Sequence, residues 1–173
     1  MKRIFAPGAF ALALLAGGSA AFAQNSEDWA KSRLSGRIGA FLPFENELRD
    51  LAKIWLTLGV DLEVPGRLFP QAQTVVSIDW ATHNGGTNAN IVPITLSQRW
   101  YSGDVGNRTY WQAGIGGAML DFSPSDFVFS AKAALGVEFK ENYFVEADIF
   151  FTDKHGSTNV SGSGAAVYFG VRF

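Results

Sequence analysis

Hydrophobic and polar residues alternate with a period of two along most of this chain. Between residues 54 and 64 the apolar parity consists of Ile54, Leu56, Leu58, Val60, Leu62 and Val64. The opposite parity consists of Trp55, Thr57, Gly59, Asp61 and Glu63. The same alternation recurs over residues 128–139 and 143–151. Because successive side chains of a strand point to opposite faces, this period predicts β-strands with one apolar and one polar face.

The alternating segments predict an all-β chain. The expected strands cover residues 33–41, 53–64, 73–82, 91–101, 109–120, 128–139, 143–151 and 164–173. Turn-forming residues such as Pro65-Gly66 separate the strands, and no helical segments alternate with them, so a parallel α/β fold is excluded. Residues 42–52 fit either a short helical turn or a loop. Pro93 cannot donate a ladder hydrogen bond, so we expect a bulge there or a strand that begins at Ile94.

Charged residues of the predicted strands all fall on the less apolar parity. They are Arg33 and the members of a predicted lumen charge network: Arg37, Lys53, Asp61, Glu63, Asp79, Arg99, Lys132, Glu138, Glu146, Asp148 and Arg172. Two closed antiparallel architectures fit this segregation. One is an eight-stranded up-and-down transmembrane β-barrel with its apolar face outward, and the other is a soluble lipocalin-like barrel with its apolar face inward.

The positions of aromatic residues favour the transmembrane barrel. We predict two aromatic girdles, with Trp80, Phe129 and Phe151 at one end and Trp100, Trp111, Phe139, Tyr143 and Phe173 at the other. Rings of this kind mark the two membrane interfaces, whereas they are too bulky to fill an eight-stranded interior. The polar parity also contains glycines that leave room for charged side chains inside: Gly39, Gly59, Gly114, Gly116, Gly136 and Gly170.

Composition and the N-terminal sequence place the chain in the cell envelope. Only 17% of the 173 residues are charged, against about 25% in an ordinary soluble domain. Residues 1–23 combine a basic start, an apolar segment and an Ala21-Phe22-Ala23 cleavage site, which predicts a signal peptide followed by one barrel domain over residues 24–173. The chain has no cysteine, and without a basic run it is not expected to bind nucleic acid.

The last segment, residues 165–173, alternates apolar residues and ends in Phe173. It resembles the C-terminal strand of bacterial outer-membrane β-barrel proteins, and the strand number is similar to that of small OmpA-type and OmpX-type barrels. The resemblance implies a bacterial outer-membrane location, contact with outer-membrane lipid and lipopolysaccharide, and recognition of the Phe173 strand by the barrel-assembly machinery. It also implies external loops at 42–52, 83–90, 121–127 and 152–163, and periplasmic turns at 65–72, 102–108 and 140–142.

Candidate chemistry is sparse. His83 and His155 fall in predicted outer loops, where such residues are typically solvated, and Trp55 is interpreted as a plug near the outer rim. Some eight-stranded outer-membrane barrels modify lipid A with a histidine, a serine and a carboxylate, and the nearest set here is His83 with Ser77 or Ser97 and Asp79. These residues form no tight motif, so we predict no catalytic, cofactor-binding or metal-binding residues and no cofactor.

The sequence therefore leads to one functional hypothesis and two alternatives. The hypothesis is a non-enzymatic outer-membrane barrel with a structural, adhesion or surface-interaction role through its outer loops and a lumen packed with paired charges. The first alternative is an outer-leaflet lipid A-modifying hydrolase or acyltransferase. The second is a periplasmic lipocalin-like ligand-binding barrel.

Overall fold

Eight β-strands and one short helix form the part of the chain that the computed structural model describes, which is residues 33–65, 69, 71–83, 89–104, 106–140 and 142–173. The predicted signal peptide, residues 1–23, lies outside the described residues. The strands are β1 (Leu34–Pro43), β2 (Trp55–Val64), β3 (Ala72–Thr82), β4 (Asn90–Asp104), β5 (Asn107–Asp121), β6 (Ser125–Phe139), β7 (Tyr143–Thr152) and β8 (Gly164–Arg172). The helix is α2 (Asn46–Leu51).

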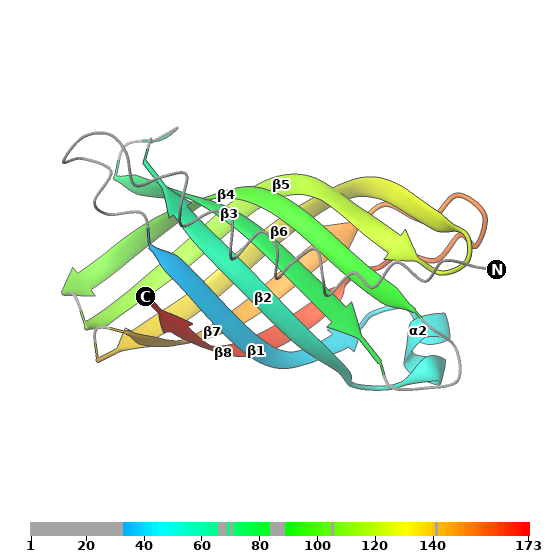
Figure 1. Ribbon diagram of the computed structural model, residues 1–173, viewed down its shortest axis with the longest axis horizontal. Helices are drawn as coiled ribbons and strands as arrows, with labels where there is room; N and C mark the ends of the chain where they lie inside the picture. Colours follow the sequence, from blue (N-terminus) through cyan, green and yellow to red (C-terminus); the bar gives the residue numbers. More distant parts are fainter. Residues whose placement is uncertain (1–32, 66–68, 70, 84–88, 105, 141) are drawn as a thin grey trace. The chain divides into compact units, whose positions relative to one another are not determined.

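The strands form a closed antiparallel barrel in which each strand pairs with its neighbours in sequence (Figure 1). The barrel closes where β1 pairs with β8, from Ser35 opposite Arg172 to Pro43 opposite Gly164. This topology confirms the predicted eight-stranded up-and-down barrel. Among the described residues, no helix is long and apolar enough to cross a membrane.

The apolar parity faces outward. Leu56, Val137 and Ile149 are 50%, 48% and 45% exposed, whereas Lys132 and Glu146 on the opposite parity are 4% and 0% exposed. Because every strand alternates in this way, the barrel has an oily exterior and a charged interior. The lipocalin-like alternative, with the apolar face inward, is wrong for this chain.

Three strands are at least three residues longer than the apolar pattern predicts. β4, β5 and β6 contain 15 residues each, and the β4–β5 ladder continues to Asp104 opposite Asn107, inside the predicted turn over 102–108. Backbone pairing does not require apolar side chains, so a hairpin can extend past the apolar band with polar residues. The alternating pattern therefore locates the wall that is covered by apolar residues better than it locates the strand ends.

β4 continues through Pro93, so the expected bulge and the expected start at Ile94 are both wrong. The β3–β4 register is the same on both sides of the proline, with Ile78 opposite Ile94 and Ala81 opposite Ile91. Pairing with β3 is interrupted between these positions, whereas Pro93 still pairs with Ala118 of β5. The missing N–H thus interrupts one ladder locally without shifting the strand.

The two ends of the barrel differ. At the loop end lie the connections over residues 44–54, 122–124 and 153–163 and the described ends of the β3–β4 connection, His83 and Ala89. At the turn end lie the described residues of the β2–β3, β4–β5 and β6–β7 connections, together with the C-terminus. Figure 1 shows α2, in cyan, at the loop end and the C-terminus at the opposite end. The chain over 42–52 thus finishes β1 and then forms the short helical turn. Leu48 of this helix is 3% exposed and belongs to the core at that end.

The predicted girdle residues lie on the outward parity at the two ends. At the turn end, Trp100 and Trp111 stack with ring centroids 3.9 Å apart, and Phe139 and Tyr143 stack at 6.2 Å. Phe173 is the most exposed of the set, at 77%. The loop-end members are Trp80, Phe129 and Phe151. Large rings therefore border the apolar outer wall on both sides.

Candidate functional site

The lumen contains a network of charged side chains, and the predicted members that join it come from seven of the eight strands. The structure brings together these predicted members: Arg37, Asp61, Glu63, Asp79, Arg99, Lys132, Glu138, Glu146, Asp148 and Arg172, each at most 4% exposed. Lys53 does not join them. The alternation predicts a strand over residues 53–64, but β2 begins at Trp55, and Lys53 lies exposed in the bend after α2.

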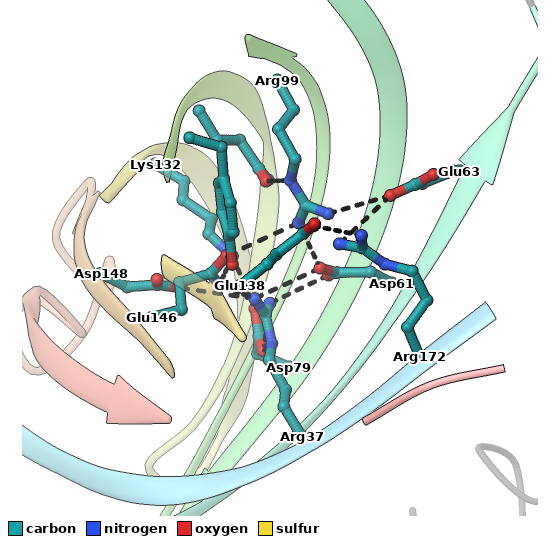
Figure 2. A network of polar contacts seen from close by, with 12 residues as sticks. Arg37, Asp61, Glu63, Asp79, Arg99, Lys132, Glu138, Glu146, Asp148 and Arg172 are labelled. Carbon is teal, nitrogen blue, oxygen red and sulfur yellow. Dashed lines mark hydrogen bonds and ion pairs between the residues drawn. The ribbon is translucent and has the colours of Figure 1, made fainter. Parts of the chain in front are cut away.

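Arg37 is the central cation of this network (Figure 2). Its Nη2 donates to both carboxylate oxygens of Asp79 at 2.7 and 2.8 Å, and its Nε donates to Oδ1 at 3.1 Å. Its guanidinium also lies 3.2 Å from Asp61 and forms an ion pair with Glu146. One buried arginine thus compensates three carboxylates from three different strands.

Arg99 forms a second centre toward the turn end. Its Nη2 donates to Asp61 at 2.6 Å, its Nη1 lies 3.3 Å from Glu63, and its Nε donates to Gln112 at 2.8 Å. Because Asp61 contacts both Arg37 and Arg99, it joins the two centres into one network.

The remaining charges continue the network in both directions. Lys132 lies 2.7 Å from Asp148 on the neighbouring strand. Near the turn end, Glu138 pairs with both Arg172 and Arg108. Arg108 was missed because it falls in the predicted 102–108 turn. Arg108 has the same parity as the inward residue Gln112 of β5, and this signal would have identified it if the predicted strand had begun at residue 107.

Three tyrosines on the inward parity belong to the network and were also missed. The Tyr110 hydroxyl donates to Glu146 at 2.7 Å, and the Tyr101 hydroxyl donates to Glu63 at 2.8 Å. Tyr168 shares a hydrogen bond of 3.0 Å with a threonine hydroxyl of β2. The rings also lie 3.7 to 4.6 Å from guanidinium carbons, Tyr101 beside Arg108, Tyr110 beside Arg99 and Tyr168 beside Arg37. Each of the three tyrosines thus makes both a hydrogen bond and a cation–π contact.

Glycines on the inward parity make space for these side chains. A Cβ on Gly136 would overlap the ring of Tyr110, which lies opposite it on β5. A Cβ on Gly59 would lie 2.9 Å from the Cγ of Arg37 and closer still to Asp79. Close packing of this kind leaves no room for a methyl group at either position.

An apolar plug fills the lumen at the loop end. Trp55 is 1% exposed, meets Phe41 edge-on at 6.0 Å, and donates from Nε1 to the carbonyl oxygen of Ala52 at 2.9 Å. Phe41 in turn stacks on Phe150 at 4.9 Å. The interpretation of Trp55 as a plug near the rim is confirmed. We define the plug as Phe41, Leu48, Trp55, Ala81, Ala89, Ile91, Ala118, Leu120, Val128, Phe150 and Ala166.

The histidine, serine and carboxylate considered for lipid chemistry do not form a catalytic arrangement. His83 is 9% exposed and packs against Trp55 at 4.9 Å, and within the part of the chain described neither ring nitrogen has a hydrogen-bond partner. It is therefore bonded to neither Ser77 nor Ser97. Asp79 is held by the central arginine. No three histidine, aspartate or glutamate side chains among the described residues are placed to hold a metal ion.

The second histidine is buried as well, so the prediction of solvated loop histidines is wrong. His155, on the 153–163 connection, is 2% exposed. It is hydrogen-bonded on both sides of its ring. Loop residues are usually exposed, but both of these histidines are buried.

Comparisons with known proteins bear on the fold. No family model matches the sequence, and a search of curated proteins finds no match either. Among solved structures, Neisserial surface protein A (NspA) is 12% identical with a TM-score of 0.57, and the match covers 81% of this chain and 94% of that one. The outer-membrane enzyme PagL is 11% identical with a TM-score of 0.55, covering 82% and 99%. The N-terminal β-barrel domain of Pseudomonas aeruginosa OprF is 14% identical with a TM-score of 0.49, covering 82% and 98%.

The similarities to NspA and PagL establish the fold, that of small outer-membrane eight-stranded barrels. At 11% and 12% identity they concern the fold alone. A fold of this kind carries different activities on different proteins, so the function must be argued from the lumen and the loops.

Proposed function

We propose that this chain is an integral outer-membrane protein whose loop end faces the outside and acts as a structural, adhesion or surface-interaction element, without enzymatic activity. Its lumen does not conduct. Its surroundings are outer-membrane lipid and lipopolysaccharide, and its Phe173 strand is the segment that the barrel-assembly machinery binds during insertion.

The proposed membrane location rests on the distribution of apolar and charged residues, which is the reverse of that in a soluble barrel. The outer wall exposes large apolar side chains such as Ile115 at 62% and Leu135 at 68%, while arginines and carboxylates are buried inside. In water this arrangement would leave an extended apolar surface exposed, whereas in a bilayer the same surface contacts acyl chains.

The contents of the lumen support a closed barrel. Eight strands enclose a space that side chains can fill. Here the ion-pair network and its tyrosines occupy one part, and the plug with Phe41 and Trp55 occupies the loop end. A solute would have to displace both to pass.

Fractionation of cells tests the location. The protein is expected in the membrane fraction, to be extracted only by detergent, and to run as a compact band on gels unless it is boiled. Release by osmotic shock without detergent would overturn the proposal. In planar bilayers we expect no steady openings, and openings of defined size would contradict the closed lumen.

A charge on the outer wall tests the orientation of the barrel. Leu58→Arg places a cation near the middle of β2 on the outward face and is expected to cost about 2–4 kcal/mol of folding free energy in lipid. The matched control is Val64→Arg at the end of the same strand, where the cost is expected to be about 0–1 kcal/mol. Urea unfolding in lipid vesicles measures both. Equal stability of the two variants would argue against a bilayer around this wall.

A further inference from the structure

Two loops at the loop end are joined through one imidazole. His155 belongs to the 153–163 connection, and its Nε2 lies 2.6 Å from the carbonyl oxygen of Pro124 in the β5–β6 connection. Its Nδ1 faces the backbone N–H groups of Ser157 and Thr158, each at 3.3 Å. The ring therefore both folds its own loop and ties that loop to the neighbouring hairpin.

Further contacts at the same place bring the two loops together. The backbone N–H of Gly156 donates to Oδ2 of Asp126 at 2.8 Å, and the ring of Phe122 lies 5.9 Å from that of His155. Because these contacts involve the residue after His155 and the residues around Pro124, their geometry depends on the position of the imidazole.

The partners of the ring fix its protonation state. A carbonyl oxygen can only accept a hydrogen bond, and a backbone N–H can only donate one. Nε2 must therefore carry the hydrogen, and Nδ1 must be bare. The Ser157 hydroxyl, 3.2 Å from Nδ1, can donate to the same nitrogen. A protonated ring would direct an N–H at two other N–H groups.

We propose that His155 is a proton-sensitive latch: the neutral ring holds the 153–163 connection against the β5–β6 connection, and protonation releases it.

The charged groups around the His155 ring do not prevent protonation from releasing the latch. Asp121 and Asp126 belong to the β5–β6 side, and Asp153 and Lys154 to the side of His155. Asp126 interacts electrostatically with the ring and would attract an imidazolium. Its two oxygens already accept the N–H groups of Phe127 and Gly156 at a solvent-exposed edge, where water screens the attraction. The clash at Nδ1 is at contact distance, on a ring of a residue that is only 2% exposed, so it outweighs this screened attraction.

The second histidine of the chain, His83, serves as the control for His155. The chain has two histidines and no cysteine. His83 lies in the plug region and has no hydrogen-bond partner in the described part of the chain, so it can be replaced without touching the latch. Cysteines introduced for labelling have no native competitors.

Spin labels at Ser123→Cys and Thr158→Cys, one on each connection, report the separation of the loops in the full-length barrel in detergent micelles. The labelled parent is expected to show a short, narrow distance distribution at about pH 8, and to lose about half or more of it by about pH 5. In His155→Gln, whose amide does not titrate, the distribution is expected to be the same at both pH values. His83→Gln is expected to respond like the parent, as is Asp126→Asn.

Each result bears on the latch. A parent distribution that does not change with pH would overturn the proposal, and so would a pH response that survives in His155→Gln or disappears in His83→Gln. A compact unboiled gel band for every variant at both pH values shows that the barrel itself stays folded. Since the measurement is made in micelles, it does not depend on the proposed outer-membrane location, which fractionation tests separately.

Discussion

The two parts of the lumen are held together by different physics. In the network around Arg37 and Arg99, stability depends on direction and charge, because each carboxylate removed from water must meet a cation. In the plug around Trp55, stability depends on volume, because the rings of Phe41 and Phe150 fill the space between strands. A narrow barrel can therefore be closed by either means, and the two parts of the lumen are expected to respond differently to mutation.

The largest effect is expected when a central cation is removed. Arg37→Met leaves Asp79, Asp61 and Glu146 with one cation fewer in a buried site and should cost about 4 kcal/mol of unfolding free energy. Urea unfolding in vesicles measures the loss. Arg49→Met on α2, where the arginine is exposed, is the control and should change little. A loss below about 1 kcal/mol for Arg37→Met would show that the network is hydrated and screened like a surface cluster.

A truncation in the plug should cost somewhat less. Trp55→Ala leaves a cavity at the rim, where the 44–54 connection can partly collapse into it, so about 3 kcal/mol is expected. Trp111→Ala removes an equally large ring from the outer wall, where lipid can fill the space, and should cost less when measured by the same unfolding assay. Equal losses would mean that the plug is not close-packed.

A single methyl group tests how tightly the charged part is packed. Gly136→Ala should displace Tyr110 and weaken its hydrogen bond to Glu146, at a cost of about 1–3 kcal/mol. The matched control is Gly36→Ala, because a Cβ there would meet only Phe173 Cε2 at 3.9 Å. If the two variants unfold at the same urea concentration, the lumen around Tyr110 can accommodate a methyl group, and the network is not close-packed there.

The smallest effect is expected for the histidines in a chemical assay. His83→Ala and His155→Ala should leave the lipid A of the producing cells unchanged by mass spectrometry, because neither histidine is bonded to a carboxylate side chain in a catalytic arrangement. A change in the acyl pattern that depends on either residue would restore the lipid-modifying alternative.

The period of two was enough to predict the wall of the barrel. It gave the number of strands, the direction in which their faces point, and the inward positions of residues such as Lys132 and Glu146. It failed at Lys53 because a helix and a bend precede β2, and the alternation before Trp55 is accidental. It missed Arg108 because polar residues at the end of a hairpin look like a turn.

The choice of partners inside the lumen could not be predicted from the period. Arg37 of β1 reaches Asp79 two strands away in one direction and Glu146 two strands away in the other. Such contacts depend on how the strands are staggered around the axis. The contact between His155 and Pro124 depends on loop conformations that no alternation encodes. Pattern determines which face a residue occupies, whereas stagger and loop path determine what it touches.

The pairing of β1 with β8 makes completion of the barrel depend on its eighth strand. Until β8 is in place, β1 and β7 each present a row of unpaired backbone groups, which is a template for joining another chain. A protein shortened before Gly164 would therefore not form a smaller cylinder. It would be a curved sheet with two unpaired edge strands, prone to aggregate. The nine residues of β8 that complete the ring therefore also prevent pairing with other chains.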